Sequence, residues 1–176
     1  MGDHLLLVGM MGAGKSTVGV LLARRMARPH VDIDGEIERD ARRPVAEIFS
    51  SEGEPAFREL EKAKLRSVLS SPAAAVVSVG GGAVIDAANR ALMRDSAAVV
   101  WLRARPDTLW SRVADSASRP LLGTPESATR RTTLEELNDA RRPLYEEVAT
   151  FVVDTDDLDP EQVAEEVLAV VGRKVP

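Results

Sequence analysis

The chain has 176 residues, of which 44% are hydrophobic and 3% aromatic, and it contains no cysteine. This composition excludes an intrinsically disordered chain, disulfide scaffolds and cysteine-based zinc sites, and the length predicts one domain over residues 1–176. The net charge of −5, from 23 Lys and Arg against 28 Asp and Glu, argues against a general nucleic-acid or membrane-surface binder, because the field that attracts polyanions is missing.

Five short apolar runs alternate with longer amphipathic stretches along the chain. We predict that the apolar runs are buried strands, because they lack the alternation of polar and apolar residues seen in half-exposed strands. These strands cover residues 4–8, 30–33, 74–79, 97–102 and 150–153. Helices are predicted over residues 15–27, 35–41, 45–49, 56–69, 87–94, 107–113, 133–148 and 160–171. The alternation indicates an α/β fold, a three-layer sandwich with helices on both faces of a parallel sheet.

A glycine-rich motif directly follows the first predicted strand. Residues 9–17 read Gly-Met-Met-Gly-Ala-Gly-Lys-Ser-Thr and match the phosphate-loop pattern G-x-x-x-x-G-K-[ST]. Backbone N–H groups of such a loop point at phosphate oxygens, Lys15 reaches the β- and γ-phosphates, and the Ser16 hydroxyl ligates Mg²⁺. The remaining nucleotide-binding positions predicted in the loop are Gly12, Ala13, Gly14 and Thr17. The motif predicts binding of a nucleoside triphosphate, and the alternative is a glycine-rich turn with an unrelated lysine.

Two aspartates, Asp32 and Asp34, stand at the end of the second predicted strand. Alternation along a strand would put both carboxylates on one side, at the edge where open α/β sheets bind ligands. One carboxylate could hold Mg²⁺ through water, and the other could orient and deprotonate an attacking hydroxyl. The alternative is a solvated strand end whose aspartate caps the next helix.

Three consecutive glycines, Gly80, Gly81 and Gly82, follow the third predicted strand. Glycines at such a point allow the backbone to approach a ligand and offer N–H donors, although a structural turn is the alternative. Arg58 precedes Glu61 by three residues, so one helix face can hold both side chains. Solvated surface positions are the ordinary expectation for this arginine and for Arg141, and composition alone does not select either of them.

Residues 115–126 are small and polar and are interrupted by proline and glycine. This composition predicts a mobile surface loop, and a plain connection is the alternative to a functional one. The loop contains Arg119.

Taken together, these motifs resemble the shikimate kinases, P-loop enzymes of the nucleoside-monophosphate-kinase-like group. The likeness follows the chain in order through residues 9–17, 32–34, 48–49, 53–61, 80–82, 119–122, 141–145 and 153–155. The resemblance implies a five-stranded parallel sheet of order 2-3-1-4-5. It also implies Mg²⁺-ATP-dependent phosphorylation of the shikimate 3-hydroxyl, a step toward chorismate and the aromatic amino acids.

The resemblance implies roles for residues of the acceptor site, in a substrate-binding segment at about residues 34–60. Asp34 would bind the substrate hydroxyls and act as the base. The shikimate carboxylate would be held by Arg58 and Arg141, with a backbone N–H from the triple glycine. The ring would lie against two aromatic side chains, Phe49 and Phe57.

Further implied roles concern the nucleotide. Asp32 would support Mg²⁺ through water, and Arg112 would pack on the adenine. Arg119 would close over the phosphates as part of a lid at about residues 112–126. Catalysis would then depend on Asp34, Lys15 and Arg119.

Two segments depart from the family pattern. Arg42 occupies a position where a glycine is common, which affects the expected turn. Acidic residues in the segment 154–159 replace positions that are often basic in relatives, so nucleotide affinity or base selectivity would differ.

Two other functions remain open from the sequence. One is another small-molecule kinase of the same fold, such as a gluconate kinase, and the other is a nucleotide-binding regulatory module without turnover. The chain begins Met1-Gly2-Asp3-His4, without the basic segment of a secretory signal, so we expect a cytoplasmic protein. Its expected partners are ATP and shikimate, with no nucleic acid or membrane, and the resemblance favours a monomer.

Overall fold

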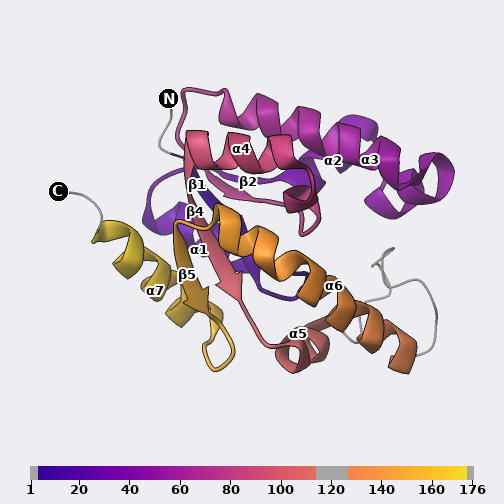
Figure 1. Cartoon of the computed structure of the whole chain (residues 1–176). Coiled ribbons are helices and arrows are strands. Elements are labelled where there is room, and N and C mark those ends of the chain that lie inside the picture. The colour runs from indigo at the N-terminus through magenta and orange to yellow at the C-terminus, as the bar shows by residue number, and fades with distance from the viewer. Residues whose placement is uncertain (1–3, 114–126, 174–176) are drawn as a thin grey trace.

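A parallel sheet forms the centre of the computed structural model, which describes residues 4–113 and 127–173 (Figure 1). Its strands are β1 (His4–Val8), β2 (His30–Asp32), β3 (Val76–Ser78), β4 (Ala97–Arg103) and β5 (Phe151–Asp154). All neighbouring strands pair in parallel, in the order β2-β3-β1-β4-β5. This order and the α/β class confirm the predicted fold.

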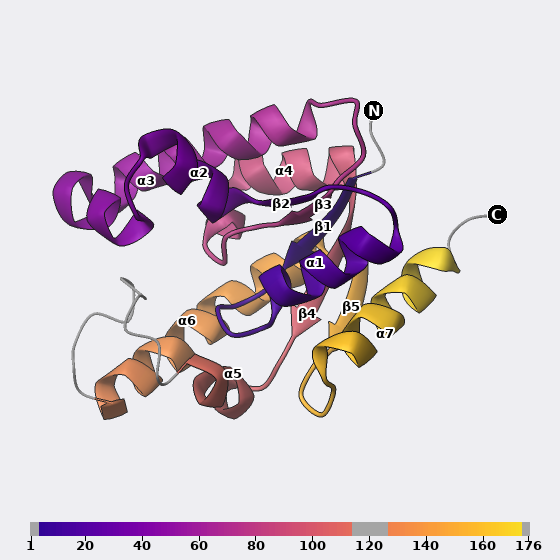
Figure 2. The same cartoon turned by 180° about the vertical axis from the view of Figure 1, so that it is seen from behind.

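Helices cover both faces of the sheet. They are α1 (Lys15–Arg25), α2 (Ile33–Ala41), α3 (Val45–Leu69), α4 (Ala87–Ser96), α5 (Pro106–Val113), α6 (Ser127–Val148) and α7 (Pro160–Gly172), with a short 3₁₀ helix η1 (Ala83–Ile85). Helices α4 and α6 lie in front of the sheet in Figure 1, and α1 and α7 lie in front in Figure 2, seen from behind. The arrangement gives the three predicted layers. None of the helices in the described part of the chain is long and apolar enough to cross a membrane.

The central strand β1 shows why the apolar runs lack alternation. All five of its residues are buried, and Leu5, Leu6 and Leu7 are at most 2% exposed. In a parallel sheet covered on both faces, successive side chains enter two apolar layers, so neither face selects polar residues. The phosphate loop leaves the carboxyl end of this strand, where the site is built.

Helix α3 differs from the prediction of two separate helices over residues 45–49 and 56–69. The helical chain continues between them with a kink at Gly53, where φ is 82° and ψ is 168°. Glycine adopts this conformation without a Cβ clash, and Pro55 then suits the first turn of the second arm because its missing N–H would have no helical acceptor there. The kink therefore divides α3 without ending it.

Two further differences concern helix ends. Helix α6 begins at Ser127 rather than at residue 133, since its first turns include polar residues that carry no apolar periodicity. Arg42 ends α2 in the left-handed conformation, with φ 53° and ψ 32°. This arginine thus adopts the backbone geometry that a glycine would favour at a helix end, and the turn is kept.

Candidate active site

A cavity of about 880 Å³ opens at the carboxyl edge of the sheet, a volume typical of small-molecule sites. The predicted site residues of the described ranges all line it: Gly12, Ala13, Gly14, Lys15, Ser16, Thr17, Asp32, Asp34, Phe49, Phe57, Arg58, Gly80, Gly81, Gly82, Arg112 and Arg141. Arg119, and most of the predicted lid, lie outside the described residues. Within the lining, Asp34, Arg58 and Arg141 lie against the triple glycine, and Arg112 lies beside the phosphate loop, 3.4 Å from Gly12 O.

The phosphate loop folds around its own lysine. Lys15 Nζ donates hydrogen bonds to the carbonyl oxygens of Gly9 at 2.8 Å and Met10 at 3.0 Å. Lys15 is also the first residue of α1, and its backbone carbonyl accepts a hydrogen bond of 3.0 Å from Ser78 Oγ on β3. The ammonium group and the positive end of α1 thus lie together at the cavity wall, an arrangement that suits a polyphosphate.

Ser16 and Asp32 place two oxygen ligands beside this loop. Ser16 Oγ donates to Asp32 Oδ2 at 2.5 Å, while Asp32 Oδ1 accepts from the backbone N–H of Gly35 at 3.3 Å as the N-cap of α2. Asp32 therefore combines the cavity position that we predicted with the capping role that was its alternative. Hydroxyl and carboxylate oxygens of this kind suit Mg²⁺, which takes few protein ligands and keeps water or substrate phosphate in the other positions.

Asp34 lies in the cavity, but not by the geometry expected from strand alternation. Strand β2 ends at Asp32 and α2 begins at Ile33, so Asp34 belongs to the first turn of a helix. The prediction that Asp32 and Asp34 alternate on one strand is therefore wrong, because the chain turns into α2 at once. Both carboxylates still face the same cavity.

The triple glycine forms a floor beneath four charged side chains, those of Asp34, Arg58, Glu61 and Arg141. A Cβ built on Gly80 would lie 2.9 Å from Asp34 Oδ1, and one built on Gly82 would lie 2.5 Å from Arg58 Cζ. On Gly81, it would lie 3.7 Å from Arg141 Nη1. Consecutive Cα atoms are 3.8 Å apart, so two guanidinium groups and two carboxylates meet above three adjacent residues.

Glu61 is a site residue that the sequence reasoning treated only as a partner of Arg58. The two side chains share one helix face, as the spacing allows, and they pair there, with Arg58 Nη1 donating to Glu61 Oε2 at 2.7 Å and Glu61 fully buried. Burial raises the pKa of Glu61 above its ordinary value, and Arg58 and Arg141 offset this effect only in part. A buried carboxylate thus holds Arg58 at the floor of the cavity and feels the charge of Arg141 there.

Tyr145 is a second residue whose contact the sequence did not predict. Its hydroxyl donates to the backbone oxygen of Gly81 at 2.6 Å, and its ring stacks on Trp101 with centroids 5.7 Å apart. Tyr145 follows Arg141 by one helical turn on α6, so the bond fixes the helix that carries this arginine against the glycine floor. Arg141 is 3% exposed, and its Nε makes no hydrogen bond within residues 4–113 and 127–173.

The kink in α3 brings two aromatic rings together at the cavity wall. Eight residues separate Phe49 from Phe57, a rise of about 12 Å on a straight helix. The ring centroids are instead 4.8 Å apart, because the chain bends at Gly53. Both rings line the cavity next to Arg58.

Arg112 forms the other end of the cavity together with the segment after β5. Its Nη1 donates to Thr155 Oγ1 at 3.0 Å and its Nη2 to Thr155 O at 2.6 Å.

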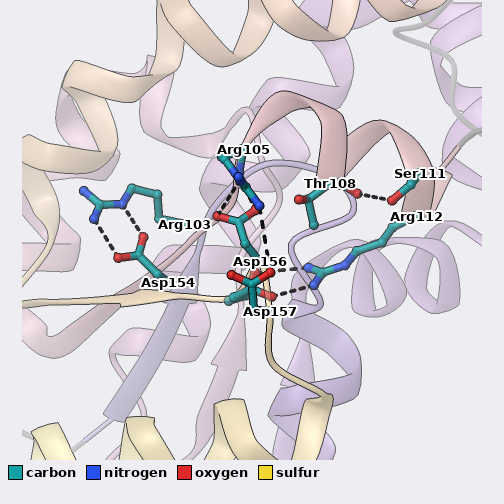
Figure 3. Close-up of polar contacts among 9 residues, drawn as sticks. Arg103, Arg105, Thr108, Ser111, Arg112, Asp154, Asp156 and Asp157 are labelled. Carbon is teal, nitrogen blue, oxygen red and sulfur yellow. Dashed lines mark hydrogen bonds and ion pairs between the residues drawn. The ribbon is translucent and has the colours of Figure 1, made fainter.

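The acidic side chains of the segment after β5 have partners other than Arg112 (Figure 3). Asp154 forms a bidentate ion pair with Arg103 at 2.6 and 2.8 Å. Asp154, Asp156 and Asp157 line a separate cavity of about 720 Å³. That cavity also includes Met10 of the loop, but none of the three aspartates lines the cavity of the candidate site.

The burial of Glu61 predicts a particular dependence of stability on pH. Because its pKa in the folded chain is raised above the ordinary 4.5, Glu61 contributes stability that is full below that value and is lost as pH rises through the folded pKa. We expect the free energy of unfolding of wild type, relative to Glu61→Gln, to fall as pH rises above about 4.5. Urea unfolding of wild type and Glu61→Gln at a series of pH values measures this difference in free energy. The exposed neighbour Glu59→Gln is the control, and a pH-independent difference between wild type and Glu61→Gln would contradict the expectation.

The chain is similar to known small-molecule kinases. A sequence model of the shikimate kinase family matches residues 11–172. A shikimate kinase of Cereibacter sphaeroides is 47% identical over 161 residues, which make up 91% of this chain and 78% of that protein. A solved shikimate kinase from Acinetobacter baumannii, in complex with shikimate, has a TM-score of 0.92 at 33% identity and covers 100% of this chain and 97% of that one. A gluconokinase from Sinorhizobium meliloti has a TM-score of 0.64 at 26% identity, over 97% of this chain and 92% of the other.

Proposed function

The chain belongs to the shikimate kinase family, and from this premise we propose how its own residues carry out the reaction. The protein is a kinase that phosphorylates shikimate with ATP. In our proposal the acceptor is the 3-hydroxyl, and the products are shikimate 3-phosphate and ADP. The observation that carries the proposal is the convergence of Arg58, Arg141 and Asp34 above three adjacent glycines beside a phosphate loop.

The two arginines form the site for the carboxylate of the substrate. Planar guanidinium groups match a carboxylate with paired hydrogen bonds, and the buried Nε of Arg141 is a donor with no hydrogen-bond partner in the described ranges. Glu61 holds Arg58 in position, and Tyr145 fixes α6 beside it. Phe49 and Phe57 would then enclose the apolar part of the ring.

Asp34 would orient the acceptor hydroxyl and receive its proton. Phosphoryl transfer requires in-line positioning and neutralisation of charge more than covalent chemistry by the protein. The substrate oxygen forms a bond to the γ-phosphorus, the bond between that phosphorus and the ADP oxygen breaks, and ADP leaves with the electron pair. The hydroxyl proton passes to the carboxylate of Asp34.

The phosphates of ATP would occupy the loop of residues 9–17, where Lys15 exchanges its bonds to Gly9 O and Met10 O for the β- and γ-phosphates. Ser16 and Asp32 fit a Mg²⁺ site, the hydroxyl as a direct ligand and the carboxylate through water. Bound Mg²⁺ would neutralise phosphate charge during transfer. Arg119 is proposed to close over the phosphates within a lid at about residues 112–126.

The deciding experiment is a coupled assay of ADP release by the purified protein. We expect release with ATP, Mg²⁺ and shikimate, and none above background with gluconate in place of shikimate. Release with gluconate alone would identify the related kinase activity instead. ATP binding without release from either acceptor would indicate a nucleotide-binding module.

Arg141 provides a test of the carboxylate site. Arg141→Ala removes one charge-assisted pair worth roughly 1.5–3 kcal/mol, so we expect shikimate KM to rise about 10- to 150-fold. The neighbouring Arg142→Ala is the matched control, because Arg142 pairs with Glu146 on the exposed side of α6. Steady-state kinetics at varied shikimate measure both variants. A shikimate KM that is unchanged in Arg141→Ala would remove this arginine from the carboxylate site.

We also propose that the protein is a cytoplasmic monomer of one kinase domain, with ATP and shikimate as its partners and no nucleic acid or membrane. Its net negative charge supports small-molecule substrates over polyanionic partners. The family match over residues 11–172 supports one domain.

A further inference from the structure

Helix α5 is held at both of its ends by two consecutive residues of the segment after β5. At its carboxyl end, Arg112 donates to the side chain and backbone oxygens of Thr155. At its amino end, Asp156 Oδ1 accepts a hydrogen bond of 2.8 Å from the backbone N–H of Arg105, the residue directly before α5 (Figure 3). Thr155 and Asp156 therefore attach one eight-residue helix at two points.

We propose that Asp156 is a positioning residue for nucleotide binding, and that it acts by keeping Arg112 in place at the base-binding end of the cavity. The inference rests on the proposed function, which places the phosphates of ATP in the loop of residues 9–17. It assigns a role in binding ATP to an acidic side chain that does not itself line the cavity of the phosphate loop.

The layout of the cavity identifies the end at which the nucleotide base would bind. Asp34, Arg58 and Arg141 lie together over the triple glycine and form the proposed acceptor end, and the phosphates are proposed to fill the loop. A nucleotide whose phosphates fill the loop must extend its base to the opposite end, which is lined by Arg112 and Thr155. Arg112 Nη1 also lies 3.4 Å from Gly12 O, so this side chain connects the base end to the phosphate loop.

The attachment by Asp156 acts at the opposite end of α5 from the contact of Arg112. Arg105 and Arg112 are seven residues apart, about 10 Å along a helix. The buried side chains of Leu109 and Val113 anchor α5 in the core, and Asp107 pairs with Arg131 of α6. The bond from Asp156 adds the contact that fixes the backbone entering α5 relative to the segment that carries Thr155, the partner of Arg112. In our proposal, losing this bond shifts Arg112 relative to Thr155.

The surroundings of Asp156 favour its carboxylate form. Burial alone would raise the pKa of this carboxyl, but the Thr108 side chain, the backbone N–H of Arg105 and the charge of Arg105 outweigh burial and lower it. A carboxylate at the amino end of a helix is further stabilised by the helix dipole. Asp156 is therefore ionised at neutral pH and holds the first turn of α5.

Asp157 supplies a matched control in the next position. Its side chain is 93% exposed, whereas that of Asp156 is 15% exposed. The nearest approach of Asp157 to Arg105 is 3.9 Å, between Oδ1 and Nη2, which makes a weak surface pair. Removing either residue changes the net charge by the same amount, but only Asp156 bonds the backbone that leads into α5.

The experiment compares Asp156→Ala, Asp157→Ala and Asp156→Asn with wild type. ATP affinity is measured by calorimetric titration without shikimate, and both KM values are measured by ADP release. We expect Asp156→Ala to weaken ATP binding and raise its KM about 10-fold, as for one charge-assisted bond, with the shikimate KM nearly unchanged. Asn keeps the acceptor oxygen and should recover most of the ATP affinity, and Asp157→Ala should match wild type.

Equal ATP affinity in Asp156→Ala and Asp157→Ala would overturn the inference. So would a thermal destabilisation of Asp156→Ala with normal ATP affinity, since that result assigns a merely structural role. If Asp156→Ala does not fold, Asp156→Ser replaces it, with a smaller loss expected and no loss overturning the inference. Failure of wild type to phosphorylate shikimate would reject the proposed function, while the ATP titration would still test Asp156.

Discussion

Asp34→Asn is expected to lower kcat with shikimate by about 10²- to 10⁴-fold, the usual contribution of a positioned general base. Asparagine keeps the size of the side chain and one acceptor oxygen, but it cannot take the proton of the acceptor hydroxyl. Asp34 lies in the first turn of α2 and is not part of the phosphate loop that would hold ATP. ATP affinity should therefore remain close to that of wild type.

Stopped assays of ADP formation measure kcat, and a separate titration measures ATP affinity. Glu36→Gln is the matched control, because Glu36 lies in the same helical turn but pairs with Arg39 on the surface. Near-normal kcat in Asp34→Asn would show that another group accepts the proton. A large loss of ATP affinity in the same variant would show that Asp34 acts through the fold of the site.

Lys15→Met is expected to abolish measurable transfer, with a loss in kcat of roughly 10³-fold or more. Loss of a single donor to charge that develops in a transition state costs about 10²- to 10³-fold, and Lys15 carries a full charge that methionine lacks. The lysine also bonds two carbonyl oxygens of its own loop. The variant therefore loses the cation that would bind the phosphates and the two hydrogen bonds that hold the loop in its folded shape.

Single-turnover measurements with saturating ATP separate the loss of chemistry from a loss of ATP binding. Lys64→Met controls for the removal of a lysine, because Lys64 pairs with Asp40 at the surface. Thermal unfolding of each variant shows whether the loop change affects the whole fold. Transfer by Lys15→Met at a rate near that of wild type would mean that the γ-phosphate is stabilised without this lysine.

Local patterns were sufficient for the sheet and the phosphate loop. The five apolar runs predicted all five strands, because burial on both faces of a parallel sheet leaves a continuous apolar signal in the sequence. The loop at residues 9–17 was found because its function depends on consecutive residues. The order β2-β3-β1-β4-β5 came from the family resemblance, since nothing in the runs themselves encodes which strands are neighbours.

Contacts between distant parts of the chain could not be read from local patterns. Tyr145 reaches Gly81 across 64 positions, and its place within a helix gives no sign of this partner. The spacing of Arg58 and Glu61 indicated that one helix face could hold both, but not their ion pair or the complete burial of Glu61. Alternation was the wrong rule for Asp34, because a three-residue strand is too short to reveal where the helix begins.

The glycine floor has a consequence for how substrate preference can change in this protein. A methyl group added at Gly82 would overlap the Arg58 guanidinium, and one added at Gly80 would meet both Asp34 and Glu61. A larger residue at either position would therefore displace the charged ends that bind the acceptor, so it would change substrate preference by moving those groups. The aromatic wall offers a different route, because Phe49 and Phe57 project from the two arms of a bent helix and carry no charge.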